Sequence, residues 1–204
     1  MIANHKQPRW SFYLLWILLT MFCVPIAFFL SLIILRIIVL FVGDFINVNG
    51  VQHITEDYLA LYVFVPLMGL LTGVLQYELL RRYFPRMRSW VAATIGGWLL
   101  GAFLILTHGW LNPTNTVLSL DLAFLIMGLS IGVGQWLLLR QRLPRAGWWI
   151  GANVVGWSIL ALVTNGNSMG QFGLFALGLL PACATALMLA LLIKQVQPTG
   201  SQGA

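Results

Sequence analysis

The sequence predicts an all-α fold: a single polytopic bundle, residues 1–204, of six transmembrane helices with both termini in the cytoplasm. Composition carries the first part of this prediction, because 60% of the 204 residues are hydrophobic and 8% are charged, whereas soluble domains are about a quarter charged. Apolar runs near the ~20 residues that cross a hydrocarbon core carry the second part. These runs cover roughly 11–40, 59–80, 90–109, 117–139, 147–164 and 171–193. They do not alternate in polarity as the strands of a membrane barrel do.

The first run follows Lys6 and Arg9 and is too long for a cleavable signal peptide, so we expect a retained signal anchor. Its length and Pro25 indicate tilt, a kink or an extension beyond the membrane. Arg36 lies near its outer end, and we expect it to pair with an acidic residue in preference to binding a transported anion. The candidate partners are Asp44, Glu56 and Asp57. Glu78 is expected to pair in the same way with Arg81 or Arg82.

Apart from Arg36, every Lys and Arg flanks or ends an apolar run. By the positive-inside rule, the loops between runs two and three and between runs four and five lie in the cytoplasm together with both tails. The residues expected to determine this topology are Arg81, Arg82, Arg86, Arg88, Arg140, Arg142 and Arg145. The net charge of +6 therefore reflects orientation, and no nucleic-acid partner is expected.

Residues 68–102 and 127–161 align without a gap, and sixteen of the thirty-five positions are identical. The match includes the short basic loops, which indicates a duplicated hairpin that joins run two to three and run four to five. The sixth run carries Gly178, Ala182 and Thr185 at helical spacing and looks like a weaker third copy of the descending half. The first run could be a diverged ascending half. Copies with a single topology do not fit the inverted-repeat architecture of many transporters.

Small residues recur four apart on both helices of each repeat, as at Gly69 and Gly73 before the loop and at Gly97 and Gly101 after it. Such stripes let helix backbones approach closely, and we expect the two stripes to face each other inside each hairpin. Gln76 and Thr94 are each nine residues from Pro85 and therefore lie at similar depth.

Gln135 and Asn153 stand in the same relation to Pro144. A glutamine amide can bond across the hairpin and satisfy groups that hydrocarbon leaves unpaired. The favoured interpretation is thus a hydrogen-bonded clamp made by Gln76, Thr94, Gln135 and Asn153. The alternative is a polar ligand site or solute path lined by the same residues.

Tryptophans near the basic loops are expected to anchor at the headgroup level; they are Trp10, Trp90, Trp148 and Trp149. Trp98 and Trp157 lie about two turns deeper beside Gly97 and Gly156. They are expected to fill space next to these glycines, with a ring-stacking surface for a pigment, quinone or sterol as the alternative.

Catalytic motifs are missing or misplaced, so no enzymatic activity is expected. The "GLSIG" stretch at 128–132 matches a nucleophile motif that requires a strand-to-helix turn, and here it falls inside a helix. No Walker loop, dinucleotide fingerprint or H-E-x-x-H occurs. His5, His53 and His108 are scattered, which excludes a haem or metal motif, although His108 could ligate a pigment singly.

The pattern G-x-x-x-G-x-x-Q-[WY]-x-L-L-R followed by P-R-x-x-x-W and G-W occurs twice. It resembles a family of small multi-spanning bacterial membrane proteins found mainly in photosynthetic and filamentous groups. The resemblance covers 68–161, implies helical hairpins and supplies no catalytic residue. Tyr77, Glu78, Met87 and Arg88 depart from the pattern in the first copy.

Two functions follow as expectations. The favoured one is a non-enzymatic accessory or scaffold subunit of a larger complex in a bacterial cytoplasmic or internal photosynthetic membrane. It would contact lipids and other subunits or copies of itself, and would be able to hold lipid or an apolar cofactor such as a pigment. The alternative is a small-solute channel or carrier with a path lined by Gln76, Gln135, Thr94 and Asn153.

Overall fold

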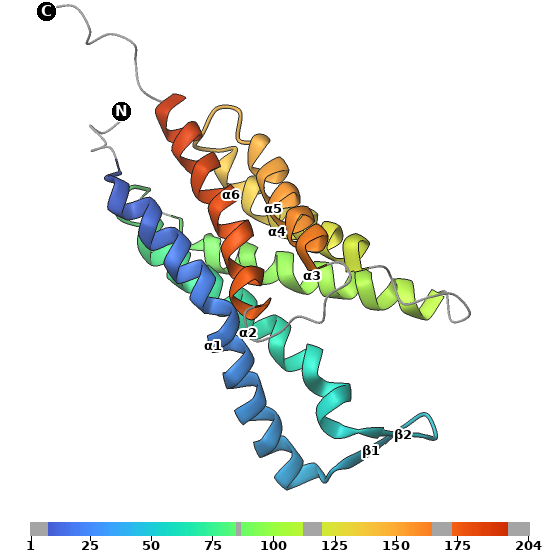
Figure 1. The fold of residues 1–204 in the computed structure, drawn as a ribbon. Coiled ribbons are helices and arrows are strands. Elements are labelled where there is room, and N and C mark those ends of the chain that lie inside the picture. The colour runs from blue at the N-terminus through green and yellow to red at the C-terminus, as the bar shows by residue number, and fades with distance from the viewer. Residues whose placement is uncertain (1–7, 85–86, 112–119, 165–172, 196–204) are drawn as a thin grey trace, which may run out of the picture.

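The computed structural model describes residues 8–84, 87–111, 120–164 and 173–195. They form six helices and one strand pair: α1 (Trp10–Val42), β1 (Phe45–Val48), β2 (Val51–Ile54), α2 (Thr55–Leu80), α3 (Ser89–Leu111), α4 (Leu120–Leu139), α5 (Trp148–Thr164) and α6 (Gly173–Gln195). The predicted helical fold is confirmed, and each helix overlaps one predicted run (Figure 1). Residues 117–119 and 171–172 of those runs lie outside the described residues.

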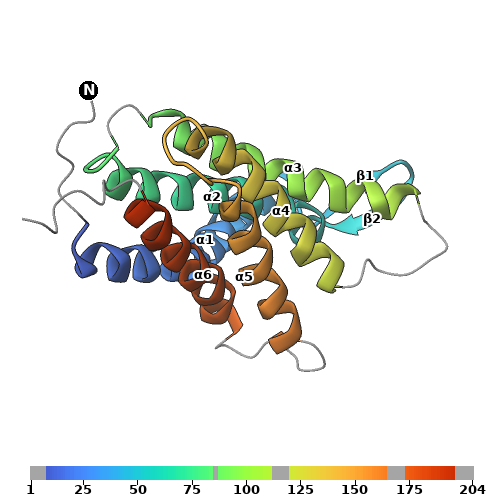
Figure 2. The ribbon, with the colours of Figure 1, turned by 90° about the horizontal axis from the view of Figure 1, so that it is seen from above.

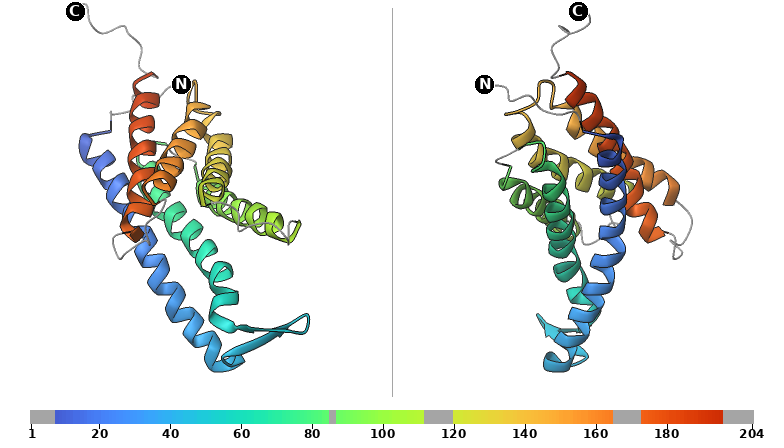
Figure 3. Two further views of the ribbon diagram at one scale, coloured as in Figure 1. Left: turned by 45° about the vertical axis from the view of Figure 1, so that its right-hand side comes forward. Right: turned by 90° about the vertical axis from the view of Figure 1, so that its left-hand side faces the viewer.

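The helices form a closed ring, because each packs against its neighbours in sequence and α6 returns to pack against α1 (Figure 2). An apolar cluster joins the start of α1 to the loops at 81–88 and 140–147 and to the last turns of α6. We call this the closed end. Away from it, the α1–α2 pair and the α3–α4 pair diverge, and we call the opposite side the splayed end (Figures 1 and 3).

Five of the helices are long and apolar enough to cross a membrane by length and composition: α1, α2, α3, α4 and α6. The remaining helix, α5, has 17 residues, which is the lower limit of what spans a hydrocarbon core. α1 has 33 residues, or about 50 Å at the helical rise of ~1.5 Å per residue. It is therefore much longer than the ~30 Å core.

The strand pair between α1 and α2 was not expected. α1 ends at Gly43, whose φ of 95° places it in the left-handed region that glycine adopts readily. β1 and β2 pair antiparallel with Val48 opposite Val51, so Asn49 and Gly50 form a two-residue turn with φ of 54° and 84°. Positive φ at both central residues is typical of the tight hairpin turn that Asn-Gly favours. The "NG" dipeptide was thus a sequence signal for this hairpin.

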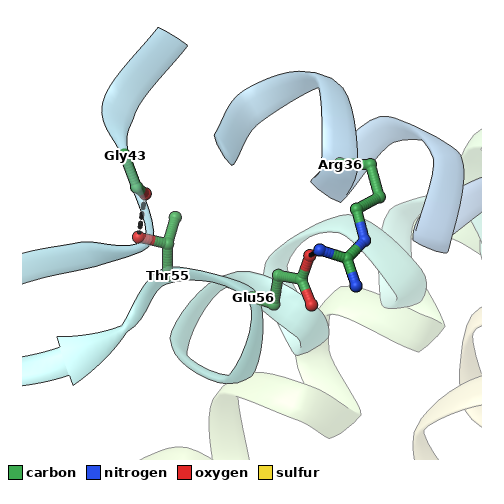
Figure 4. A network of polar contacts seen from close by, with 4 residues as sticks. All are labelled: Arg36, Gly43, Thr55 and Glu56. Carbon is green, nitrogen blue, oxygen red and sulfur yellow. Dashed lines mark hydrogen bonds and ion pairs between the residues drawn. The ribbon is translucent and has the colours of Figure 1, made fainter. Parts of the chain in front are cut away.

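Polar contacts secure the junction between α1 and α2 (Figure 4). The Thr55 hydroxyl donates to the Gly43 carbonyl at 2.7 Å. Arg36 Nη1 lies 3.0 Å from Glu56 Oε1, which confirms the predicted ion pair and selects Glu56 among its candidates. Glu56 also lies in the first turn of α2, where a negative charge is favourable to the helix dipole. At the other end of α2, Glu78 pairs with Arg81 as expected.

Glycines mark the points of closest approach, but only half of the predicted arrangement is present. Gly69 and Gly73 of α2 face α3 inside the first hairpin, as expected. Gly97 instead faces Ile131 of α4, and Gly156 faces Pro181 of α6. The prediction that both stripes meet inside one hairpin is therefore wrong. In a closed ring each helix has two neighbours. The stripe before the loop packs inside the hairpin, and the stripe after the loop packs against the helix that follows the hairpin.

Adjacent glycines of α3 allow a matched test of this packing. A Cβ at Gly97 would lie 2.7 Å from the Ile131 backbone, whereas a Cβ at Gly96 would have nothing within 4 Å. We expect Gly97→Ala to lower stability by about 1–3 kcal/mol, because the backbones must separate. Gly96→Ala should leave stability unchanged or raise it. Thermal unfolding in detergent measures both, and equal melting temperatures would contradict the α3–α4 contact.

Candidate functional site

A layer of polar side chains crosses the bundle between two apolar clusters. The first cluster lies at the closed end and contains Trp16, Trp90 and Trp149. The second lies toward the splayed end and contains Val24, Met68, Trp98, Ile131 and Trp157. The buried polar residues between them come from five helices: Thr72, Gln76, Thr94, Gln135, Asn153 and Thr185. We call this set, together with Thr20 of α1, the polar layer.

Three tryptophans each donate an indole hydrogen bond into the polar layer. Trp90 Nε1 donates to Gln76 Oε1 at 3.2 Å and Trp149 Nε1 donates to Gln135 Oε1 at 2.9 Å. These two bonds occupy equivalent positions 59 residues apart. Trp16 Nε1 donates to Thr185 Oγ1 at 3.1 Å and so joins α1 to α6. In each pair an odd-numbered helix (α1, α3 or α5) supplies the donor and an even-numbered helix supplies the acceptor.

The same three indoles contact one another around the centre of the ring. Their centroids are 6.4 Å (Trp16 to Trp90), 6.1 Å (Trp16 to Trp149) and 6.0 Å (Trp90 to Trp149) apart, all edge to face. This geometry suits the quadrupoles of aromatic rings. All three are 0% exposed, so the interpretation of Trp90 and Trp149 as headgroup anchors is wrong. Trp10 and Trp148 are exposed, as an anchor requires. We call Trp16, Trp90 and Trp149 the tryptophan triad.

Hydrogen bonds also run between the two hairpins. Gln135 Nε2 donates to Gln76 Oε1 at 3.2 Å and to Thr94 Oγ1 at 3.1 Å. Gln76 Nε2 donates to Thr20 Oγ1 at 3.3 Å. The predicted clamp residues therefore do meet, but the partners differ from those expected, since Gln135 bonds Thr94 of the other hairpin. Asn153 donates to the Trp149 carbonyl of its own helix at 3.0 Å.

Trp98 and Trp157 lie one layer further toward the splayed end. Their ring centroids are 5.5 Å apart in an edge-to-face contact, and Phe124 stacks on Trp157. Both indoles pack beside glycines, because a Cβ at Gly69 or Gly128 would press on Trp98 or Trp157 respectively. These are glycines of the preceding helix, not the neighbours in sequence. A role of the pair as a stacking surface for a bound ring stays a prediction.

A small cavity of about 40 Å³ lies beside the polar layer. Its walls include Thr72, Gln76, Gln135 and Asn153 on the polar side and Trp98 on the apolar side. Two of these residues carry buried atoms without a hydrogen-bond partner, namely Trp98 Nε1 and Thr72 Oγ1. No Asp, Glu, Lys, Arg or His is among the residues that line it.

The chemistry available in this layer is hydrogen bonding by neutral groups. Within the described part of the chain, no cluster of His, Cys, Asp and Glu could hold a metal ion. Ser130, the serine of the "GLSIG" stretch, is buried inside α4. Sequence reasoning identified Gln76 and Gln135 and noted Thr185 only in the weaker third copy of the descending half, but it missed Trp16 and Thr20, because α1 matches the repeat weakly. The signal that could have found Trp16 and Thr20 was their spacing, which equals that of Trp90 and Thr94.

The described arginines that were predicted to determine topology do not belong to the polar layer. Arg81, Arg82, Arg88, Arg140, Arg142 and Arg145 lie in or beside the loops of the closed end. Arg140 lies over the Trp136 ring with its guanidinium carbon 5.1 Å from the centroid. Arg86 lies outside the described residues.

Replacement of Gln135 by leucine tests the polar layer. The variant leaves the buried Trp149 Nε1–H without its acceptor, which costs about 1–3 kcal/mol, so we expect a lower melting temperature. Adding Trp149→Phe should recover part of this loss, because a site without either partner has no orphaned donor. Gln141→Leu is the control, since Gln141 is exposed. Thermal unfolding of the wild type, Gln135→Leu, Trp149→Phe, the double variant and Gln141→Leu checks the prediction, and strictly additive losses from the two single variants would contradict it.

The geometry can be set beside known proteins. Comparison of the chain with family models, with curated proteins and with solved structures gave no match.

Proposed function

We propose that this chain is a non-enzymatic integral membrane protein that serves as an accessory or scaffold subunit of a larger membrane complex. The main support for the proposal is that contacting side chains fill the axis of the bundle. The tryptophan triad and its surrounding cluster fill the closed end, and Gln76 and Gln135 bond to each other and to the triad. These interior side chains therefore hold the helices together.

The outer surface of α1 supports the same proposal. Phe29, Ile33, Ile37 and Phe41 are exposed and recur every four residues along one face of its outer half. We call these four residues the α1 stripe. Phe41 is 86% exposed and lies one residue before the end of α1 at Val42, far from the tryptophan triad. A long apolar face on the extended α1–α2 pair suits contact with a transmembrane helix of another subunit.

The length of α1 adds to this argument. Phe41 is thirty-one residues beyond Trp10 in a helix that runs from Trp10 to Val42, so it lies about 45 Å from the start of α1 at ~1.5 Å per residue. An upright helix would carry Phe41 well past the ~30 Å hydrocarbon core. Tilt in the membrane or cover by a partner would shield this part of the α1 stripe from water.

The proposal also covers the orientation of the chain in the membrane and its bacterial origin. We infer six spans, with both termini and the basic loops in the cytoplasm of a bacterial cell or facing the same side of an internal photosynthetic membrane. The gathering of Arg81, Arg88, Arg140 and Arg145 at the closed end supports this orientation.

A tandem duplication of the hairpin is part of the same proposal, and matched backbone contacts support it. Phe84 N donates to Leu80 O at 2.7 Å, and Leu143 N donates to Leu139 O at 2.8 Å, 59 residues further on. Trp90 N and Trp149 N likewise donate to Met87 O and Ala146 O, each at 2.9 Å.

A channel or carrier is the weaker proposal. The cavity beside the polar layer favours it, because its walls include Gln76, Gln135 and Asn153. The tryptophan triad opposes it, because a solute would have to displace three contacting indoles to leave through the closed end. Shrinkage of proteoliposomes in a urea gradient, followed by recovery faster than in protein-free vesicles, would favour the channel.

The scaffold proposal is tested by gentle detergent extraction from the native host, a native gel and mass spectrometry of the band that contains this chain. We expect migration with other membrane-protein subunits at a mass well above 22.7 kDa. The double variant Ile33→Ala, Ile37→Ala should weaken this co-migration, because it removes side chains from the α1 stripe.

The matched control is Leu187→Ala, Leu191→Ala, which trims two exposed residues four apart on α6. This control should keep the assembly intact. A band that contains only copies of this chain, together with urea flux in vesicles, would contradict the scaffold and favour the channel.

A further inference from the structure

The cavity beside the polar layer has hydrogen-bonding capacity that the protein does not use. Trp98 is 6% exposed, and its Nε1–H has no hydrogen-bond partner in the described part of the chain. An indole N–H can only donate. Leaving such a group buried and unpaired costs about as much as a lost hydrogen bond, so its retention next to an open volume points to an occupant.

Two neighbouring polar groups have capacity to spare. The Thr72 hydroxyl lacks a hydrogen-bond partner, lies near the Cys23 thiol and can either donate or accept. Gln76 uses one N–H for Thr20, while its carbonyl oxygen already accepts from Trp90 and Gln135. The ligand atom that complements Trp98 Nε1–H must therefore be an acceptor, and the Thr72 hydroxyl can add a second contact in either direction.

Charge and volume limit the occupant further. No ionisable Asp, Glu, Lys, Arg or His lines the cavity, and an ion without a partner in so apolar a site would be costly. The volume of about 40 Å³ admits roughly three water molecules, whereas the apolar cavity that takes benzene is about 150 Å³. The occupant is thus neutral and has only a few heavy atoms.

We propose that this cavity is a binding site for a small neutral molecule whose oxygen accepts a hydrogen bond from Trp98 Nε1–H. Water has this chemistry, and so does a small alcohol or carbonyl compound that displaces it. The apolar residues that line the cavity together with Trp98 include Val24, Met68 and Ile131. The site stands independently of the scaffold role.

The test uses the full chain in detergent micelles with ¹⁵N-labelled indoles. Trp98→Phe assigns the Trp98 signal, and Trp157→Phe is the matched control on the ring that contacts it. We expect a cross-peak between the Trp98 indole proton and bound water. The indoles of Trp90 and Trp149, which donate to glutamine oxygens, should give no such cross-peak and serve as internal references.

Val24→Leu provides a second variant, because the larger side chain fills part of the cavity that Val24 lines. We expect it to abolish the Trp98–water cross-peak.

Titration with methanol and with urea distinguishes the sources of the oxygen. A saturable shift of the Trp98 signal that is lost in Val24→Leu supports a site for an organic solute. An unchanged signal with the water cross-peak retained supports water itself as the occupant. Absence of both the cross-peak and any shift, or a cross-peak unaffected by Val24→Leu, would overturn the proposal.

Discussion

The bundle depends on one kind of interaction, the hydrogen bond from a buried indole to an acceptor on the next helix. An indole N–H away from water must find a partner or cost about 1–3 kcal/mol. Trp90 and Trp149 find glutamine oxygens, and Trp16 finds the Thr185 hydroxyl. Each bond joins two different helices, so the three bonds make three helix pairs: α2 with α3, α4 with α5, and α1 with α6. The bonds of Gln135 to Gln76 and Thr94, and of Gln76 to Thr20, then connect these pairs to one another.

Apolar burial alone would not select this arrangement. In a bilayer the lipid tails are as apolar as leucine, so helix association relies on close packing and on polar contacts. The glycines supply the close packing, as where Gly73 admits Val91 and Gly178 admits Met21. Polar contacts then set the depth at which the helices meet, because Gln76 and Gln135 can bond only at one level of the bundle.

The two ends of the molecule have different physical characters as a result. At the closed end the triad, the loops and the ends of the helices form one apolar cluster. Toward the splayed end the helix pairs diverge (Figure 3), and the ion pair of Arg36 with Glu56 joins α1 to α2. The cavity lies beside the polar layer, where the tight part of the bundle gives way to the divergent part. This position explains how an open volume and unpaired polar atoms coexist with dense packing nearby.

The amino-acid sequence by itself determined the helical character of the chain, the approximate bounds of six helices and the residues most important to the polar layer. These follow from local properties: apolar runs of sufficient length, basic loops, and the recurrence of Gln76 and Gln135 in matching segments. The turn at Asn49 and Gly50 was also encoded locally.

Only the tertiary structure decided which groups pair. Trp16 and Thr185 are 169 residues apart and meet because α6 closes on α1. Gln135 bonds Thr94 rather than Asn153 because the ring brings α3 against α4. Trp90 and Trp149 are buried, although their positions near basic loops predicted exposure. The physical reason is that local spacing defines the depth of a side chain along its helix, whereas its rotation toward a neighbour is set by the packing of the whole ring.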